Sequence, residues 1–306
     1  MADVAVIILA YNEERHIARA LASVAPFVRE VVVVDSFSTD RTVAIARQAG
    51  AVVLSHPFVN YARQFQWALD HAPVTAHWIL RLDADEIVEP ELAREIEARL
   101  AALPDDVVGI NLKRKHVFLG RWIRFGGRYP LLLLRLWRRG HGRIEDRWMD
   151  EHIVVSGGRT IAFEGAFVDH NLNDLGFFTQ KHNAYATREA IDVLNQKFRF
   201  APRDEDLSRG NSSLQASMKR RIKEGLYNRT PFAIASLLYF LYRYVLRLGF
   251  LDGFEGLCYH VLQGFWYRFL VGAKVVELER AIRGLASPEA IRLELERRTG
   301  LPISRR

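Results

Sequence analysis

The stretch Trp78-Ile79-Leu80-Arg81-Leu82-Asp83-Ala84-Asp85-Glu86 is an apolar run of strand length that ends in three acidic side chains within four residues. Because side chains in a strand alternate with a period of two, Asp83 and Asp85 project in the same direction at its carboxyl end. Two adjacent carboxylates repel each other, and a cation relieves that repulsion. Mg²⁺ or Mn²⁺ typically binds one or two carboxylates together with substrate phosphates. The pattern therefore predicts a divalent metal site, with a solvated strand end as the alternative.

Strand and helix patterns alternate four times within the first 90 residues. The uninterrupted apolar runs at residues 4–10 and 30–34 are typical of strands buried on both faces. Helical spacing of apolar residues follows at 13–24, where Asn12 is placed to cap the helix, and again at 60–71. This alternation predicts an α/β fold with βαβ units, a mostly parallel sheet and helices on both faces.

Polar clusters follow three of these strands, where ligands bind in open α/β sheets. The clusters are Tyr11-Asn12-Glu13, Asp35 with Asp40-Arg41, and Asp83-Ala84-Asp85. Three such clusters at successive strand ends indicate a binding site better than they indicate packing. The chain lacks the glycine-rich signatures of dinucleotide and ATP sites and the Gly-x-Ser-x-Gly turn of serine hydrolases. The sequence therefore does not support ordinary dinucleotide binding, ATP binding or serine hydrolase activity.

The composition is that of a globular protein with a sizeable core and an anionic partner. Of 306 residues, 49% are hydrophobic and 26% are charged. The single cysteine, Cys258, excludes an internal disulfide and suits a reducing compartment. The start Met1-Ala2-Asp3 lacks the basic region of a secretory signal. The net charge of +7 favours a nucleotide, a nucleic acid or an anionic lipid as partner.

The carboxyl-terminal third combines basic and aromatic segments. Residues 209–229 are basic, and apolar aromatic segments follow at 232–242 and 254–271. Neither aromatic segment has the roughly 20 uncharged residues that a spanning helix needs. Aromatic residues mixed with arginine on helices are typical of segments in the membrane interface, and basic residues beside them are drawn to anionic lipid. Packing against the α/β domain or a second subunit is the alternative. Long apolar segments between the basic residues argue against a nucleic-acid partner.

The three polar motifs, read as Ala10-Tyr11-Asn12-Glu13-Glu14, Asp35 to Thr42 and Leu82 to Glu86, resemble those of family 2 glycosyltransferases with the GT-A fold. The chain more closely resembles the bacterial branch that builds lipopolysaccharide core and related lipid-linked glycans. The resemblance implies a Rossmann-like catalytic domain at 1–200 and helical membrane-associating segments at 201–306. It also implies an inverting hexosyltransferase that uses a nucleotide-sugar donor, most often a UDP-sugar.

The resemblance also implies roles for individual residues. The triplet Met149-Asp150-Glu151 stands where the family often has Val-His-Glu, so Glu151 is the favoured catalytic base and Asp150 its close competitor. Asp83, Asp85 and His170 are the implied metal ligands; a buried structural histidine is the alternative for His170. Arg128 and Lys181 are expected at the diphosphate or, equally, on a solvated surface. The implied donor-binding set is Tyr11, Asn12, Glu13, Asp35, Asp40, Arg41, Asp83, Arg128 and Lys181.

These observations combine into a hypothesis of a metal-dependent enzyme on the inner face of the plasma membrane. It would move one sugar from a nucleotide to the hydroxyl of a lipid-linked saccharide, with a carboxylate accepting the hydroxyl proton. A divalent ion and arginines would stabilise the nucleoside diphosphate as it leaves. Two rivals are transfer to a polyprenyl phosphate and a non-catalytic membrane-bound scaffold. The sugar, the acceptor linkage and the oligomeric state stay open.

Overall fold

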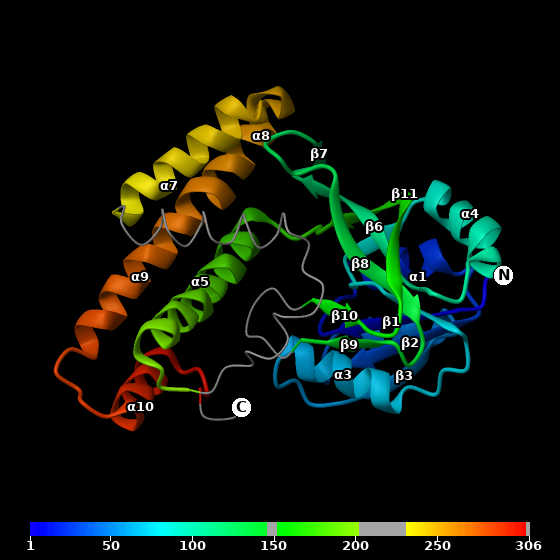
Figure 1. Cartoon of the computed structure of the whole chain (residues 1–306), viewed down its shortest axis with the longest axis horizontal. Coiled ribbons are helices and arrows are strands. Elements are labelled where there is room, and N and C mark those ends of the chain that lie inside the picture. The colour runs from blue at the N-terminus through cyan, green and yellow to red at the C-terminus, as the bar shows by residue number, and fades with distance from the viewer. Residues whose placement is uncertain (146–151, 202–230, 304–306) are drawn as a thin grey trace. The chain divides into compact units, whose positions relative to one another are not determined.

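A computed structural model describes residues 1–145, 152–201 and 231–303 (Figure 1). Residues 1–145 and 152–172 form one compact unit, and residues 173–201 and 231–303 form a second. The division precedes helix α5 (Leu175–Phe198), whereas the predicted domain boundary lies after residue 200. The reason is packing: the α5 residues Ala190 and Leu194 share a core with Leu278 of α9 (Tyr267–Ala281).

The first unit is built on a nine-stranded sheet of order β3-β2-β1-β4-β8-β6-β11-β5, with β7 paired to β6. Strands β3, β2, β1 and β4 run parallel to one another, which confirms the predicted βαβ half. Beyond β4 the sheet is mixed, because β8 runs antiparallel to β4 and β6, and β5 antiparallel to β11. The strands are β1 (Val4–Ala10), β2 (Glu30–Asp35), β3 (Val52–Ser55), β4 (Trp78–Arg81), β5 (Glu86–Val88), β6 (Val107–Phe118), β7 (Arg121–Ile123), β8 (Leu131–Arg138) and β11 (Arg159–His170), with β9 (Gly142–Ile144) and β10 (Ile153–Val155) in a separate pair.

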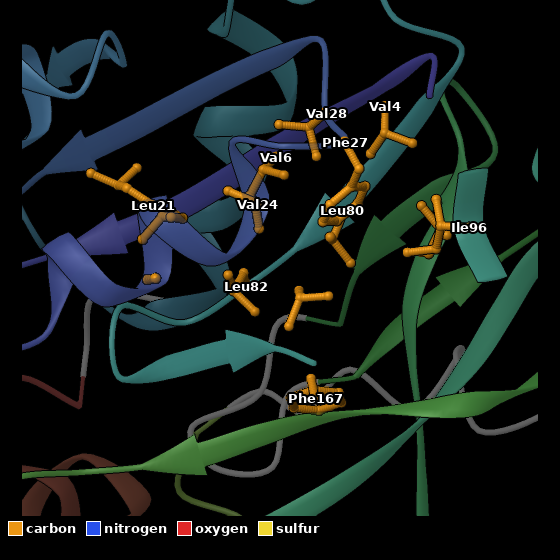
Figure 2. Close-up of a cluster of buried hydrophobic side chains, with 14 of the residues drawn as sticks. Val4, Val6, Leu21, Val24, Phe27, Val28, Leu80, Leu82, Ile96 and Phe167 are labelled. Carbon is orange, nitrogen blue, oxygen red and sulfur yellow. The ribbon is translucent and has the colours of Figure 1, made fainter. Parts of the chain in front are cut away.

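Helices cover both faces of this sheet, as predicted. Successive side chains of β1 point to opposite sides of the sheet, and because they are apolar on both sides, each side is packed against helices. Val6 and Ile8 pack with Leu21 of α1 and Ile96 of α4, whereas Ile7 packs with the α3 side. Figure 2 shows part of the first cluster, in which Val6, Leu21, Leu80, Ile96 and Phe167 gather from five elements. The helices of this unit are α1 (Ile17–Val24), α2 (Thr42–Gln48), α3 (Tyr61–His71), α4 (Pro90–Arg99) and the short η1 (Leu100–Ala102).

The prediction that Asn12 caps the first helix is wrong. Helix α1 begins only at Ile17, with His16 in the capping position. Asn12 has a φ of 54°, and its side-chain oxygen accepts a hydrogen bond from the backbone N–H of Thr39 at 2.9 Å. A long-range contact therefore uses the side chain that the local pattern assigns to the cap.

The second unit is helical. In addition to α5 and α9 it contains α7 (Phe232–Leu241), the π-helices η3 (Tyr242–Leu246) and η5 (His260–Trp266), η4 (Gly249–Asp252), α8 (Gly253–Tyr259) and α10 (Pro288–Thr299). No single helix in the described ranges has the length and apolar character to cross a membrane. The segments Phe232–Leu246 and Gly249–Ala281, bent by 71° at the break between them, meet that test only when they are taken together.

Candidate active site

Asp35 closes β2 and is held by its own loop. It pairs in register with Ala10, so the loops after β1 and β2 leave the sheet side by side. Its carboxylate accepts hydrogen bonds from the Ser38 backbone N–H at 2.9 Å and from the Ser38 hydroxyl at 2.5 Å. Asp35 is 2% exposed. In this conformation the carboxylate stabilises the loop that follows β2, and its predicted contact with the donor stays a prediction.

The loop after β1 is tied to the loop after β2 by several hydrogen bonds. The backbone N–H of Asn12 donates to the Ser38 hydroxyl at 2.9 Å, and the N–H of Glu13 donates to the Thr42 hydroxyl at 2.7 Å. In the opposite direction, the N–H of Arg41 donates to the Glu14 carboxylate at 3.2 Å. The two loops therefore form one connected rim at the carboxyl edge of the parallel strands.

Asp40 is the centre of that rim. Its carboxylate accepts from the N–H of Glu14 at 3.1 Å and from the N–H of Thr42 at 2.9 Å. Burial opposes ionisation, but the hydrogen bonds from Thr42 and Glu14 outweigh it, so the pKa of Asp40 lies below its usual value. Asn12 and Asp40, both predicted to bind donor, thus connect the loops, while Tyr11 is 59% exposed at their edge.

Asp83 is enclosed by groups that favour its charged form. The Tyr61 hydroxyl donates to Oδ1, and the Arg81 Nε lies 3.6 Å from the same oxygen. The Arg135 Nη2 lies 3.3 Å from Oδ2. Burial raises the pKa of Asp83, but the charges of Arg135 and Arg81 outweigh burial and hold the pKa well below its usual range. The first carboxylate of the acidic motif is therefore ionised and fixed in position.

The buried pair of Arg135 and Glu86 holds Asp83 in position. Arg135 Nη2 donates to Glu86 Oε1 at 2.7 Å, and Glu86 Oε2 accepts from the Asp83 backbone N–H at 2.8 Å. Burial, together with the charge of Asp83, raises the pKa of Glu86 to about 8 against the attraction of Arg135. For Arg135, burial is outweighed by Glu86 and Asp83, which raise its pKa. Arg135 thus contacts the carboxyl groups of both Asp83 and Glu86.

Asp85 and His170 are brought together by strand pairing. Glu86 of β5 pairs with Asp169 of β11, and one step farther the N–H of His170 donates to the Asp85 carbonyl at 3.0 Å. Arg19 Nη2 donates to the carbonyl of His170 at 2.8 Å. Burial and the charge of Arg19 lower the pKa of His170. A lowered pKa favours the neutral ring, which is the form that binds metal ions.

The acidic residues suit a cation that is shared with a phosphate. Within the described ranges, no three His, Cys, Asp or Glu side chains are gathered in a way that could hold a metal ion by themselves. Mg²⁺ and Mn²⁺ need only one or two carboxylates when substrate phosphates complete the shell. The ionised Asp83 and the neighbouring Asp85, whose Oδ2 accepts from Asn171 Nδ2 at 2.9 Å, are the right oxygen donors. The three-ligand set with His170 stays a prediction.

The other predicted residues lie elsewhere. Arg128 is half-buried in the loop after β7, where Gly126 and Gly127 have φ values of 66° and 71°. Lys181 lies on α5 of the second unit. Asp150 and Glu151 lie outside the described residues, so their catalytic roles stay predictions.

No individual role was predicted for Tyr61, Arg81, Glu86 or Arg135. A signal for Arg135 was present, since it is the one charged residue in the run Leu131-Leu132-Leu133-Leu134-Arg135-Leu136-Trp137. A lone charge in an apolar strand is buried only with a partner. The acidic motif supplies that partner, but only the pairing of β8 with β4 reveals it.

Comparisons with known proteins identify the family to which this chain belongs. The family described as Glycosyl transferase family 2 matches residues 5–169. An uncharacterized glycosyltransferase of Rickettsia felis is 44% identical over 35% of this chain, a match that spans only 37% of that relative. Another, RT0209 of Rickettsia typhi, is 25% identical over 94% of this chain and 92% of its own length. The lipopolysaccharide core biosynthesis glycosyltransferase LpsC of Rhizobium meliloti is 31% identical over 60% of this chain and 68% of its own length.

Among solved structures, glucosyl-3-phosphoglycerate synthase of Mycobacterium tuberculosis, in complex with Mn²⁺, UDP and glucosyl-3-phosphoglycerate, is similar over 37% of this chain and 44% of its own. The sequence identity is 24% and the TM-score is 0.31.

Proposed function

This chain belongs to glycosyl transferase family 2 and is a glycosyltransferase, and from that membership we propose that it transfers a hexose from a UDP-sugar to a hydroxyl of a lipid-linked glycan. The proposed transfer inverts the anomeric carbon and requires Mg²⁺ or Mn²⁺. Lipopolysaccharide core is the proposed acceptor class, and the similarity to LpsC supports it.

The observation that carries the proposal is the strand order β2-β1-β4. Because these strands are parallel, the loops that contain Asp35, Asn12 and Asp83 all leave the same edge of the sheet. Asp83 stands there ionised, with Asp85 two residues farther on. A nucleoside diphosphate needs a platform for its base and a cation for its phosphates, and this edge has candidates for both.

The proposed chemistry is a single displacement at the anomeric carbon. A bound divalent ion, held by Asp85 and Asp83, would offset the negative charge that grows on the departing diphosphate. Arg135, Arg81 and Tyr61 keep Asp83 in one position, so no reorganisation of that carboxylate is needed during transfer. Glu151, or Asp150, is the proposed base that takes the proton from the acceptor hydroxyl.

A donor screen followed by a transfer assay tests the proposal. Thermal shift of the full chain with UDP-glucose, UDP-N-acetylglucosamine, UDP-galactose and GDP-mannose, each with Mn²⁺, should single out a UDP-sugar. Transfer of that sugar to lipopolysaccharide core should cease in Asp85→Ala and in EDTA. The matched control is Asp105→Ala, because the Asp105 side chain is fully exposed and outside the site. Turnover by Asp85→Ala at the wild-type rate would refute the metal role.

A further inference from the structure

The hairpin of residues 231–266, which runs from α7 through η3, η4 and α8 to η5, is polar inside and apolar outside. The structure describes all of these residues, and no Val, Leu, Ile, Phe or Met side chain among them is buried. The buried residues are instead small, polar or charged, with one tyrosine. They are Ser236, Arg243, Gly249, Asp252, Gly256, Tyr259, His260 and Gly264. This distribution is the reverse of that in a water-soluble domain.

One face of the first leg is apolar and exposed. Ile234, Leu237, Leu238, Leu241 and Val245 recur at helical spacing, and between 42% and 54% of each residue is exposed. A helix on the surface of a soluble protein turns such a face toward the core. Here the opposite side of the helix turns inward, with Ser236 and Arg243.

The tip of the hairpin is the most exposed apolar part of the structure. Leu246 is 73% exposed and Phe254 is 71% exposed, and among the large hydrophobic residues that the structure describes only Met1 exceeds them. Leu248, Phe250 and Leu251 lie between them and are also exposed. An apolar surface of this extent requires a covering partner.

The interior of the hairpin resembles packing between helices in lipid. A Cβ added to Gly249 would lie 2.6 Å from His260 Nε2, and one added to Gly256 would lie 2.5 Å from the Cβ of Asp252. The glycines therefore allow close approach of backbone and polar side chains. Ser236 Oγ donates to the Phe232 carbonyl at 2.7 Å, so this hydroxyl is satisfied within its own helix.

We propose that hairpin 231–266 inserts into one leaflet of an anionic lipid bilayer, tip first, without crossing it. The first leg, Phe232–Leu246, is about 22 Å long at 1.5 Å per residue. That length falls short of the roughly 30 Å of a hydrocarbon core. The 71° bend after this leg turns the chain away from a straight span. Insertion to the depth of the headgroups and upper acyl chains fits both observations.

Charge favours anionic lipid over a second copy of this chain. Residues 232–251 contain no Asp or Glu, and Asp252 is buried. The exposed Arg247 sits between Leu246 and Leu248 at the tip. The hairpin of a second copy would bring only the half-buried Glu255 as a carboxylate for Arg247, whereas lipid phosphates lie at the depth that a flexible arginine reaches. This inference does not depend on the donor or acceptor of the proposed transfer.

Flotation of the full chain with vesicles tests this proposal. Wild-type protein should float with vesicles of three parts phosphatidylcholine to one part phosphatidylglycerol. Leu246→Glu/Phe254→Glu should lower the partition coefficient about 100-fold, since a charge replaces each inserted apolar group. Arg247→Glu should reduce binding to the mixed vesicles to the level seen with pure phosphatidylcholine.

The matched control is Leu293→Glu, which makes the same change at a leucine that is 52% exposed on α10. It should float like wild type. Circular dichroism and thermal melting confirm that each variant is folded. Wild-type protein that stays at the bottom of the gradient overturns the proposal, as does a folded double variant that floats normally. A vesicle-independent dimer that the double variant splits, measured by sedimentation, would assign the surface to a second copy instead.

Discussion

Arg135 of β8 and Glu86 of β5 form an ion pair inside the first unit, with 2.7 Å between Nη2 and Oε1. Their side chains are only 7% and 3% exposed. Because Arg135 also lies 3.3 Å from Asp83 Oδ2, it is the counter-charge on which the acidic motif depends. A charge buried this deeply is tolerated only while its partners remain in place.

Removal of that counter-charge should strongly destabilise the fold. Arg135→Met keeps much of the apolar volume but leaves the buried carboxylate of Asp83 without its main counter-charge. The free energy of unfolding in urea should fall by about 3–5 kcal/mol. Transfer activity should fall as well, because Asp83 loses a contact that fixes its position.

The control for this change is Arg159→Ala. Arg159 and Asp106 form an ion pair at 2.6 Å, but their side chains are 55% and 60% exposed. Solvent screening should limit the loss there to about 1 kcal/mol or less. Equal losses in Arg135→Met and Arg159→Ala would contradict the role given to burial.

Substitutions of the rim residues Tyr11 and Asp40 should affect different properties: Tyr11→Ala the binding of UDP, and Asp40→Ala the stability of the fold. Tyr11→Ala should leave the melting temperature unchanged and weaken UDP binding about tenfold, because loss of stacking on a base costs roughly 1–3 kcal/mol. Asp40→Ala should lower the free energy of unfolding by about 1–3 kcal/mol, because the N–H groups of Glu14 and Thr42 lose their acceptor. Isothermal titration and urea unfolding measure the two effects. Unchanged UDP binding in Tyr11→Ala would exclude a stacking role.

Because of Glu30, the free energy of unfolding should fall as the pH is lowered. It accepts from the Thr75 N–H at 2.9 Å and from the Thr75 hydroxyl at 2.5 Å. Burial opposes ionisation, but these hydrogen bonds outweigh it and lower the pKa of Glu30. A lowered carboxyl pKa contributes stability above the unfolded pKa, and that stability is lost as the pH falls through the folded pKa.

Glu30→Gln should therefore be less stable than wild type by about 1–2 kcal/mol at pH 7, with the difference shrinking toward pH 3. Urea midpoints across this range provide the measurement. Glu91→Gln is the control, because the Glu91 side chain is 66% exposed and pairs with Arg94, three residues farther along the same helix. A difference between Glu30→Gln and wild type that stays constant with pH would contradict the assignment.

The parallel half of the fold was predictable because its signals are local. The valine-rich run of β2 and the apolar run of β1 each identify a buried strand without reference to the rest of the chain. The polar residues that follow them mark the site edge for the same reason. Asn12 was misassigned because its partners, Ser38 and Thr39, lie 26 and 27 residues away and compete with a local cap.

The residues around Asp83 could not be placed from the sequence, since they come from three separate elements. Tyr61 belongs to α3, Arg81 to β4 and Arg135 to β8. They lie close together because β8 is placed between β4 and β6 in the sheet, and no repeating pattern in the sequence predicts that strand order. Sequence pattern suggested interfacial helices in the last third, but only the packing reveals that Arg243 and Asp252 face inward.

The identity of the catalytic base distinguishes the proposed acceptor from its main rival. A sugar hydroxyl must lose its proton as it attacks, and loss of a positioned base typically costs 10²–10⁴-fold in rate. A polyprenyl phosphate is already anionic at neutral pH and needs no base. Glu151→Gln should therefore lower the rate of transfer to a glycan hydroxyl by about 10²-fold or more, without changing the affinity for UDP. Asp150→Asn should have the smaller effect if Glu151 is the base. A Glu151→Gln enzyme that retains the wild-type rate would favour the polyprenyl phosphate, and a wild-type chain that binds UDP-sugars but transfers none would favour the scaffold.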